Sequence, residues 1–562
     1  MKDTKYIFVV GGVMSGVGKG IASSSIGRLL KSRGFSVSAI KVDPYVNVDA
    51  GTMNPTEHGE VFVLDDGTEC DMDMGNYERF LERDFDEGNY MTTGSVYLSV
   101  INKERNLEYG GKCVGVVPDI PKAIISKIKK AGEKDDADFV ITEIGGTLGE
   151  YQNVLFLEAI RMLKLDNPDD VITMMVSFLP FQTKGGGELK TKPTQHAVRD
   201  MNYTGLHPDF IIARASTEID EKRKEKISFH CNIEKEHVIS APDVESIYDI
   251  PVNFEKYGLT DQILKKFGMD SGSKDLEDWK EFAKKYHEAE EELVIGIVGK
   301  YFASGDFVLS DSYVSVIEAI KHAAYQENKR PVIEWLHSED FEGEGKDKEL
   351  KKINKCDGVI VPGGFGSRGI EGKINVIEYA RENDVPFLGL CYGMQLMLVE
   401  YARNVCGFEG AHTTEINLDT DYPVVDLMPE QSEVMKEGKY GATMRLGAYP
   451  AVLRPGTIAY KAYKEVDWFI EDKEYDLDGD HELIFERHRH RYEVNPKYID
   501  DFEEKGLIFS GVSPDRKLME VAELAEDEHP FFVASQFHPE FKSHPLNPHP
   551  LFLKFIKSAV VE

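Results

Sequence analysis

The chain has 562 residues and a formal net charge of −33, with 41% hydrophobic and 10% aromatic residues. This length favours two or three domains over a single core, and the composition is ordinary for a globular protein. So acidic a chain would repel nucleic acid, and no run is apolar enough to span a bilayer. Six scattered cysteines without a C-x-x-C pair favour reduced thiols in a cytoplasmic protein.

The first predicted elements form a strand, a glycine loop, a helix and a second strand. The strands are expected at Tyr6–Val10 and Val37–Val42, and the loop at Gly11–Gly20. Amides of such a loop can cradle phosphate. The loop departs from the usual G-x-x-x-x-G-K-[ST] pattern, because its first glycine comes one place early and Gly20 replaces the metal-binding hydroxyl. A tight glycine turn is the alternative, but the Gly-Lys pair between strand and helix favours phosphate binding.

Without that hydroxyl, Mg²⁺ needs carboxylates from elsewhere in the chain. Asp71 and Asp73 alternate with methionines, so we expect both on one face at a strand end. Glu143 ends the apolar run that begins at Phe139. Ligands of parallel α/β sheets bind at the carboxyl ends of strands, so these acids are candidates for the metal; solvated surface acids are the alternative.

A second anion-binding pattern follows the glycine run 185–187. Lys190 and Lys192 flank a threonine in Lys-Thr-Lys-Pro-Thr-Gln. This pattern indicates an anion-binding loop, here called the anion clasp, although an ordinary charged loop can have the same sequence. Further on, Lys226 lies in the cluster 222–226, most of which is expected to be a solvated helix face.

Composition turns polar and charged between Gly268 and Glu292, where we expect a linker helix around Trp279. Strands and helices then alternate again, with strands expected at 293–298, 332–336, 358–361 and 385–390. The fold class predicted is therefore α/β, with two doubly wound, mostly parallel sheets joined by a helical linker. The domains predicted are residues 1–268, the linker 269–292 and residues 293–562.

The clearest chemical signal is Cys391, which lies on a predicted strand-to-helix turn between Gly389 and Gly393. Small residues there allow the strained backbone of a nucleophile elbow, and the nearby helix N-terminus favours a thiolate. A buried structural cysteine is the commoner fate of a lone thiol. His538 and Glu540 supply a base and a carboxylate to orient it, which favours catalysis. The loop Pro362–Gly366 follows another strand, and its amides would form an oxyanion hole.

These motifs carry a resemblance to known proteins. Gly-Leu-Cys-Tyr-Gly-Met-Gln with Phe-His-Pro-Glu resembles class I glutamine amidotransferases, and the whole chain resembles the CTP synthase family. The resemblance implies ATP-dependent amination of UTP to CTP at the pyrimidine 4-position, with ammonia channelled from glutamine hydrolysis. It further implies Mg²⁺ and ATP, GTP as an activator, UTP and glutamine as partners, and a homotetramer that sometimes forms filaments.

The resemblance also implies roles for individual residues. Catalysis of glutamine hydrolysis falls to Cys391, His538 and Glu540. ATP binding falls to Ser15, Gly16, Val17, Gly18, Lys19, Gly20, Lys41, Asp73, Arg214 and Val244, and Mg²⁺ to Asp73 and Glu143. UTP or CTP binding falls to Ser15, Glu150, Tyr151, Gln152, Lys190, Thr191, Lys192, Pro193, Thr194, Gln195 and Lys226. Glutamine binding falls to Gly364, Tyr392, Gln395, Glu415 and Arg491, and the mouth of the ammonia passage to His58 and Val61.

Departures from the family pattern cluster in segments that serve the pyrimidine and ribose pocket. Glu150-Tyr151-Gln152 replaces Asp-Ile-Glu, Asp119 replaces a histidine, and His230 replaces a phenylalanine. A sister amidoligase acting on another uracil-like nucleotide would keep the matches and explain these departures. A filament or switch protein without catalysis would instead have lost Cys391, His538 or Lys19, and none is lost.

Two further stretches bear on function. The loop 301–313 is longer than in many relatives and belongs to the region linked to GTP activation. The run 487–493, Arg-His-Arg-His-Arg-Tyr-Glu, would suit a nucleic-acid patch in isolation. The family match and the acidic background argue against that interpretation.

Overall fold

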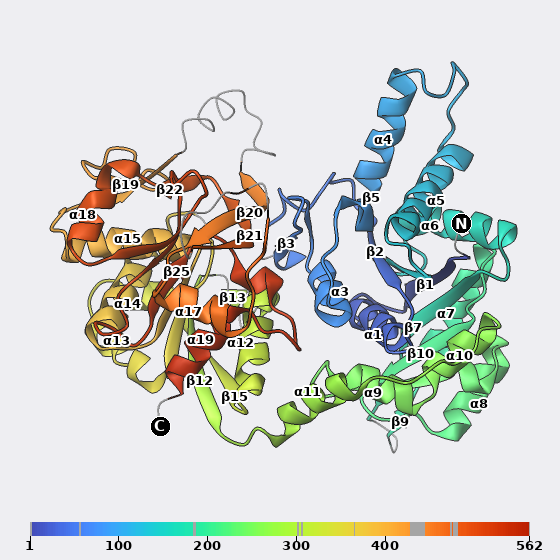
Figure 1. Cartoon of the computed structure of the whole chain (residues 1–562). Coiled ribbons are helices and arrows are strands. Elements are labelled where there is room, and N and C mark those ends of the chain that lie inside the picture. The colour runs from blue at the N-terminus through green and yellow to red at the C-terminus, as the bar shows by residue number, and fades with distance from the viewer. Residues whose placement is uncertain are drawn as a thin grey trace. The chain divides into compact units, whose positions relative to one another are not determined.

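The structure is a computed structural model that describes residues 3–54, 58–183, 187–300, 303–304, 307–308, 310–364, 366–427, 444–472, 475 and 481–560. Its internal contacts divide the chain into two compact units: Met1–Thr52 with Asp73–Lys284, and Met53–Met72 with Lys285–Glu562. Each unit is an α/β domain, as the sequence predicts (Figure 1). None of the described helices is long and apolar enough to cross a membrane.

The first unit contains a seven-stranded sheet in which every pairing is parallel. Its central strands are continuous apolar runs, which is typical of a sheet covered on both faces. In spatial order the strands are β11 (Val238–Pro242), β10 (Phe210–Ala215), β7 (Val171–Phe178), β1 (Lys5–Gly12), β6 (Phe139–Ile144), β2 (Val37–Asp43) and β5 (Tyr90–Thr92). The predicted strands at Tyr6 and Val37 are thus confirmed.

Helices cover both faces of this sheet, so it is doubly wound (Figure 1). On one face, Tyr6, Phe8 and Val10 join a core with residues of α4 (Thr93–Arg105), α5 (Val116–Lys134), α6 (Val154–Asp166), α7 (Lys192–Tyr203) and α8 (Glu221–Cys231). Helix α1 (Lys19–Lys31) packs on the sheet with α3 (Asp73–Leu81), α9 (Asp249–Lys256) and α10 (Leu259–Lys266).

The second unit contains a nine-stranded sheet whose first half is parallel. The parallel strands are β15 (Arg330–His337), β12 (Glu292–Gly299), β16 (Gly358–Val361), β17 (Phe387–Leu390) and β25 (Phe532–Ser535), which include the four predicted from sequence. An antiparallel extension follows that was not predicted: β24 (Met519–Glu523), β23 (Ile508–Val512), β20 (Arg445–Leu453) and β21 (Glu482–His490). This extension carries one wall of the site described below.

Two groups of helices cover this second sheet. One core contains residues of α14 (Ile370–Glu382) and α15 (Tyr392–Asn404), together with α13 (Lys346–Leu350) and α18 (Ile499–Glu504). The other contains residues of α12 (Val314–Gln326), α17 (Ile458–Glu465) and α19 (Pro550–Ala559). This layering buries the strand-to-helix turn at Cys391 from both sides.

The linker helix predicted around Trp279 is α11 (Glu277–Glu288). It is not a solvated spacer along its whole length, because the Trp279 side chain is fully buried and its indole N–H donates to the carbonyl oxygen of Tyr248 at 2.9 Å. The apolar face of this helix therefore belongs to the core of the first unit.

A short hairpin, β3 (Val61–Val63) with β4 (Glu69–Asp71), belongs by its contacts to the second unit. This corrects the prediction that Asp71 and Asp73 share one face of a strand, because Asp71 ends β4 whereas Asp73 begins helix α3. The apolar residues after Asp73 recur at Met74, Tyr77 and Leu81, which is helical spacing and outweighs the short alternation before them.

Candidate active sites

Cys391 lies on a strained turn between β17 and α15. Its φ is +51°, a conformation that a residue with a side chain rarely adopts and that marks functional turns. The flanking glycines are required by close packing: a Cβ on Gly389 would lie 2.9 Å from the Ala534 Cβ, and one on Gly393 would lie 2.1 Å from the Val361 carbonyl oxygen. The structure therefore has the nucleophile-elbow geometry that the sequence predicts.

His538 and Glu540 follow β25, the neighbouring strand of β17. The His538 Nδ1 lies 2.7 Å from Glu540 Oε1, so this carboxylate orients the imidazole ring. Burial lowers the pKa of His538, but the charges of Glu540 and Cys391 outweigh it and raise this pKa to about 10. His538 is thereby favoured as the imidazolium at neutral pH.

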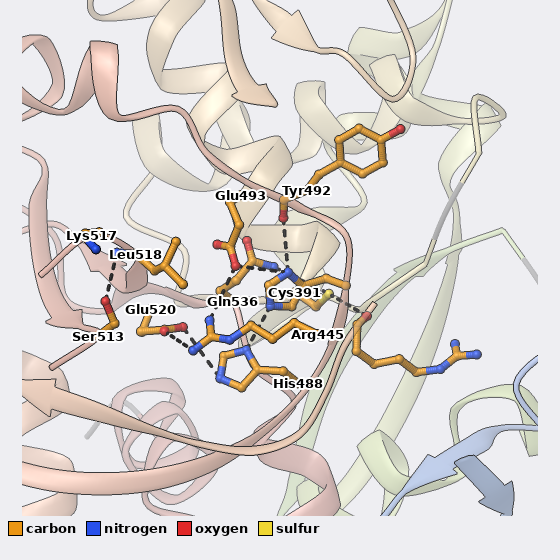
Figure 2. A network of polar contacts seen from close by, with 12 residues as sticks. Cys391, Arg445, His488, Tyr492, Glu493, Ser513, Lys517, Leu518, Glu520 and Gln536 are labelled. Atoms are coloured by element: carbon orange, nitrogen blue, oxygen red, sulfur yellow. Dashed lines mark hydrogen bonds and ion pairs between the residues drawn. The ribbon is translucent and has the colours of Figure 1, made fainter. Parts of the chain in front are cut away.

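Two polar groups face the sulfur of Cys391. The side-chain amide of Gln536 donates to the Cys391 Sγ at 3.7 Å, and the thiol lies 3.8 Å from the carbonyl oxygen of Arg489 (Figure 2). Gln536 in turn accepts from Gln395 Nε2 at 3.4 Å. Gln536 directly precedes the Phe-His-Pro-Glu motif, but its contact with the sulfur could not be predicted from the spacing of residues.

The residues expected to hold glutamine gather around the same turn. Glu415 Oε1 accepts from the backbone N–H of Gly366 at 3.0 Å, and Lys300 Nζ donates to the Gly366 carbonyl at 2.9 Å. Burial raises the pKa of Glu415, opposed by that amide and by the charges of Lys300 and Arg491. The Gln395 Oε1 is buried and forms no hydrogen bond with any residue that the structure describes.

Tyr392 and Gly364, also expected here, follow Cys391 and strand β16 respectively. The Cε1 of His538 would lie 2.7 Å from a Cβ on Gly363, so this loop touches the histidine ring directly. Within the predicted oxyanion loop Pro362–Gly366, residue 365 lies outside the described residues. The sequence analysis missed Lys300, which follows β12 and carries no local signal beyond its place after a strand.

A buried charged cluster lies beside Cys391, and no motif predicted it. Arg445 pairs with Glu520 at 2.8 Å and with Glu493 at 3.5 Å, and His488 Nδ1 lies 2.9 Å from His490 Nε2 (Figure 2). Burial lowers the pKa of both histidines well below the ordinary value and raises those of both glutamates. The run 487–493 thus covers the end of β21 and the start of β22 (Tyr492–Val494), and Arg487, His488, His490 and Glu493 are buried, which excludes an exposed nucleic-acid patch.

The glycine loop of the first unit connects β1 to α1. Val13 has a φ of +79° at the position where the usual phosphate loop has its first glycine, and Gly18 caps α1 with a φ of +82°. Ser15 and Gly16 are exposed, whereas Val17 is buried. Burial lowers the pKa of Lys19, whose Nζ donates to the Gly146 carbonyl at 2.8 Å. These residues are placed to meet phosphate at the N-terminus of α1.

The carboxylates expected to hold Mg²⁺ surround Lys41. Its Nζ bonds to Asp73, lies 3.1 Å from Glu143 Oε1 and lies 3.8 Å from Asp43 Oδ1. Burial would raise the pKa of Asp73, but Lys41 outweighs it and lowers this pKa; burial raises the pKa of Glu143. The Lys41 ammonium thus lies among three carboxylates whose combined negative charge favours a cation. Carboxylate oxygens are also the ligands that Mg²⁺ prefers, so these residues fit Mg²⁺.

Gly20 explains how the chain manages without the usual hydroxyl. A Cβ at Gly20 would lie 2.1 Å from Asp73 Oδ1, so a serine or threonine cannot stand here unless Asp73 moves. The carboxylate of Asp73 occupies the space of the missing side chain. Among the described residues no group of three or more His, Cys, Asp or Glu could hold a metal alone, so phosphate oxygens would complete the coordination.

A small hollow opens beside the start of α1. Its lining residues include Gly18, Ala22, Arg214, Pro242 and Phe254. Arg214, on β10, lies there, and its role in ATP binding stays a prediction. Val244, two residues after Pro242, is not among the residues that line the hollow in the described part of the chain.

Of the lysines in the anion clasp, Lys190 pairs with Glu188, and Lys226 lies near the same carboxylate. Lys190 Nζ bonds to Glu188 Oε2 at 2.6 Å, and the charges of Lys190, Arg223 and Lys226 all lower the pKa of Glu188, with the Lys190 hydrogen bond as the largest cause. Lys192 and Lys226 are exposed. The remaining members of the motif stabilise the start of α7: Thr191 accepts from Gln195 at 3.0 Å and Thr194 accepts from Ser177 at 2.9 Å, next to Pro193.

The altered residues of the ribose segment contact one another. Glu150 accepts from the Thr147 N–H at 3.0 Å and from Gln152 Nε2 at 2.7 Å, while Tyr151 is 96% exposed. One carboxylate oxygen of Glu150 therefore accepts a hydrogen bond from the Gln152 amide. A glutamate at position 152 could not form this bond, because an ionised carboxylate has no proton to donate. In the hairpin segment, His58 is exposed and Val61 is buried at the start of β3.

Comparisons with known proteins define the class first. Residues 5–269 match the model of the CTP synthase N-terminus, and residues 308–558 match that of class-I glutamine amidotransferases. The chain is therefore a synthase domain joined to a glutamine amidotransferase domain, which makes it a glutamine-hydrolysing carbon–nitrogen ligase.

The family follows from full-length relatives. A CTP synthase of Methanocaldococcus jannaschii is 48% identical over 566 residues, covering 100% of this chain and 99% of that protein. A CTP synthase of Thermococcus gammatolerans is 48% identical, covering 99% of this chain and 98% of that protein. A solved glutaminase domain of Trypanosoma brucei CTPS with bound acivicin is 35% identical, covering 48% of this chain and 93% of that one, with a TM-score of 0.41. The chain belongs to the CTP synthase family, and the sister-amidoligase alternative is not favoured.

Proposed function

We propose that this chain aminates UTP to CTP, using ATP and the amide nitrogen of glutamine. The observation that carries the proposal is the pairing, in one chain, of a strained Cys391 elbow beside His538 with a phosphate loop beside clustered carboxylates. Neither site alone indicates this reaction. Ammonia release joined to phosphoryl transfer indicates ATP-dependent amination, and membership of the CTP synthase family supports UTP as the acceptor.

Glutamine hydrolysis begins with attack of the Cys391 thiolate on the side-chain amide carbon. His538, held by Glu540, donates a proton to the leaving nitrogen, so that ammonia departs and a thioester remains. His538 then takes a proton from the water that hydrolyses the thioester to glutamate. Gly364, Gln395, Glu415 and Arg491 orient the substrate, and Tyr392 supports the turn.

In the first unit the loop Ser15–Gly20 and Lys41 bind ATP phosphates, with Arg214 and Val244 at the nucleoside. Mg²⁺, held by Asp73 and Glu143, would neutralise charge that develops on the phosphates. Lys19 contributes a fixed positive charge to transfer of the phosphoryl group to the 4-oxygen of UTP. Ammonia then displaces phosphate at that carbon. Lys190, Lys192 and Lys226 bind the UTP phosphates, aided by the motif 191–195, and the segment 150–152 meets the ribose.

Other features of the proposal concern regulation and assembly. His58 and Val61 line the mouth of the ammonia passage, which keeps ammonia from protonation by water. GTP activates glutamine hydrolysis. In the loop 301–313 expected to respond to it, residues 301, 302, 305, 306 and 309 lie outside the described residues. The protein acts as a cytoplasmic homotetramer and assembles further into filaments in some conditions.

The test is nucleotide chromatography after incubation with ATP, Mg²⁺ and glutamine, comparing UTP with dUTP and base-modified uridines. We expect CTP from UTP, with stoichiometric ADP and glutamate. A modified uridine aminated much faster than UTP would contradict the substrate assignment. Absence of any aminated product, with intact glutamine hydrolysis, would contradict the ligase half alone.

A further inference from the structure

The hairpin β3–β4 carries two carboxylates that reach strand β21 of the glutaminase unit. Asp65, at the hairpin turn, bonds to the Nε of Arg487, and Glu69 Oε1 lies 2.8 Å from the Nε of Arg489. The hairpin lies within residues 5–269, the part of the chain that matches the synthase model. A segment of the synthase sequence thus contacts the wall of the glutaminase site.

The Asp65 contact is buried and has several components. The Arg487 side chain is wholly buried, and Lys542 Nζ lies 3.4 Å from the second oxygen of Asp65. Burial would raise the pKa of Asp65, but the charges of Arg487 and Lys542 outweigh it and lower this pKa. The Ala448 N–H also donates to the Asp65 carbonyl at 2.8 Å. Removing one partner of such a pair leaves an uncompensated charge.

The same two arginines contact the catalytic residues through their backbones. The carbonyl oxygen of Arg487 accepts from the N–H of His538 at 2.8 Å. The carbonyl oxygen of Arg489 faces the Cys391 Sγ at 3.8 Å. Each arginine therefore joins one hairpin carboxylate to one member of the catalytic pair.

An aromatic contact provides a third connection. The Phe62 ring of β3 meets Phe541 edge-on, with centroids 4.9 Å apart, and Phe541 stacks on the His538 imidazole at 5.0 Å with an interplanar angle of 13°. The Arg487 guanidinium lies 5.4 Å from the centre of the Phe62 ring. The orientation of His538 is thus fixed from its backbone and from its ring face by residues that touch the hairpin.

We propose that Phe62, Asp65 and Glu69 are positioning residues for glutamine hydrolysis, acting on His538 and Cys391 through Arg487, Arg489 and Phe541. The synthase part of the sequence completes the glutaminase site. Displacement of reacting groups by about 1 Å costs roughly 100-fold in rate, so small shifts of these carbonyls matter. This inference rests on the assignment of glutamine hydrolysis to Cys391 and His538.

The test uses the full-length protein with Asp65→Asn and Glu69→Gln, and with Asp66→Asn as a matched control. Asp66 is an exposed carboxylate of the same turn that accepts from the Thr68 N–H, an acceptor role that asparagine keeps. For the first two variants we expect the kcat of glutamine-dependent synthesis to fall roughly 10- to 100-fold. Ammonia-dependent synthesis should stay within about twofold, since the ligase chemistry does not use these contacts.

Two further readouts separate positioning from folding. The rate of Cys391 alkylation by iodoacetamide, measured against pH without substrate, should fall in both variants and not in Asp66→Asn. The charge swap Glu69→Arg with Arg489→Glu should recover most of the activity lost in Glu69→Gln. Glutamine-dependent kcat and alkylation at wild-type levels in both variants would overturn the proposal, as would parallel loss of both activities. Wild-type protein without glutamine-dependent synthesis would instead overturn the proposed function.

Discussion

The glutaminase site and the ligase site of this chain differ in how far their reacting groups are arranged before substrate binds. At the glutaminase site the nucleophile, base and orienting carboxylate are all buried, and the base already contacts the carboxylate. At the ligase site the phosphate-binding lysines pair with the chain's own carboxylates, as Lys41 does with Asp73 and Lys190 does with Glu188. Covalent catalysis requires a preorganised nucleophile, whereas phosphoryl transfer obtains much of its charge from ligand and metal.

The largest expected effect separates the two sites completely. Cys391→Ala should lower glutamine-dependent CTP synthesis by at least about 1,000-fold, because no other group forms the thioester. Ammonia-dependent synthesis should be largely unchanged. Both rates are measured as CTP formed from UTP, with Cys406→Ala as the control. Loss of both activities together would contradict the division of labour.

The next variant should affect both nitrogen sources equally. Lys19→Ala removes a buried charge from the phosphate loop and should lower CTP synthesis from glutamine and from ammonia by roughly 100- to 1,000-fold. Lys280→Ala, which removes a surface lysine paired with Glu277, is the control. Substantial ammonia-dependent synthesis in Lys19→Ala would refute the role given to this loop.

The preorganised charge of the glutaminase site predicts a pH dependence. Because the pKa of His538 is raised to about 10, its protonated form persists well above the ordinary pKa near 6.5 and is lost as pH rises through about 10. Glu540→Gln removes the charge that raises this pKa, so the imidazolium should be lost at lower pH. Alkylation of Cys391 at pH 7 should slow by roughly 100-fold.

Alkylation of the exposed Cys113 in the same protein provides the control for that experiment. If Cys391 in Glu540→Gln keeps both the wild-type rate and the wild-type pH profile, the thiolate does not depend on this pair.

The smallest expected effect concerns the segment that departs from the family pattern. In Glu150→Asp with Gln152→Glu, the bond from Gln152 to Glu150 is lost and two charged acceptors face the ribose hydroxyls. CTP should then inhibit synthesis more strongly, by roughly tenfold in concentration. Glu158→Asp on α6 is the control. Unchanged or weaker inhibition by CTP would show that residues 150 and 152 do not determine it, and would leave Asp119 and His230 as the candidates.

The parts that could be predicted from sequence are those with local signals. The strand before the glycine loop is an apolar run that ends in two glycines, and the strand before Cys391 is a short apolar run that contains Gly389. Both lie where predicted. Asp73 was misplaced because a short alternating run fits both a strand end and a helix start.

Contacts between distant residues could not be predicted in this way. Asp65 and Arg487 are 422 positions apart, and the cluster around Arg445 joins three strands of an antiparallel extension without a motif of its own. The charge of the run 487–493 is visible in the sequence, but the partners of its residues are not. On β21, Arg487 and Arg489 pair with Asp65 and Glu69, whereas His488 and His490 contact each other.

The most direct test of the account follows the nitrogen atom. The wild-type protein is incubated with UTP, ATP, Mg²⁺ and glutamine labelled with ¹⁵N in its amide, in the presence of excess unlabelled ammonium. We predict that the CTP formed carries the ¹⁵N label at its 4-amino group in most molecules, because ammonia released at Cys391 is used without mixing with the solution. CTP labelled only in proportion to the diluted ammonia pool would contradict the account.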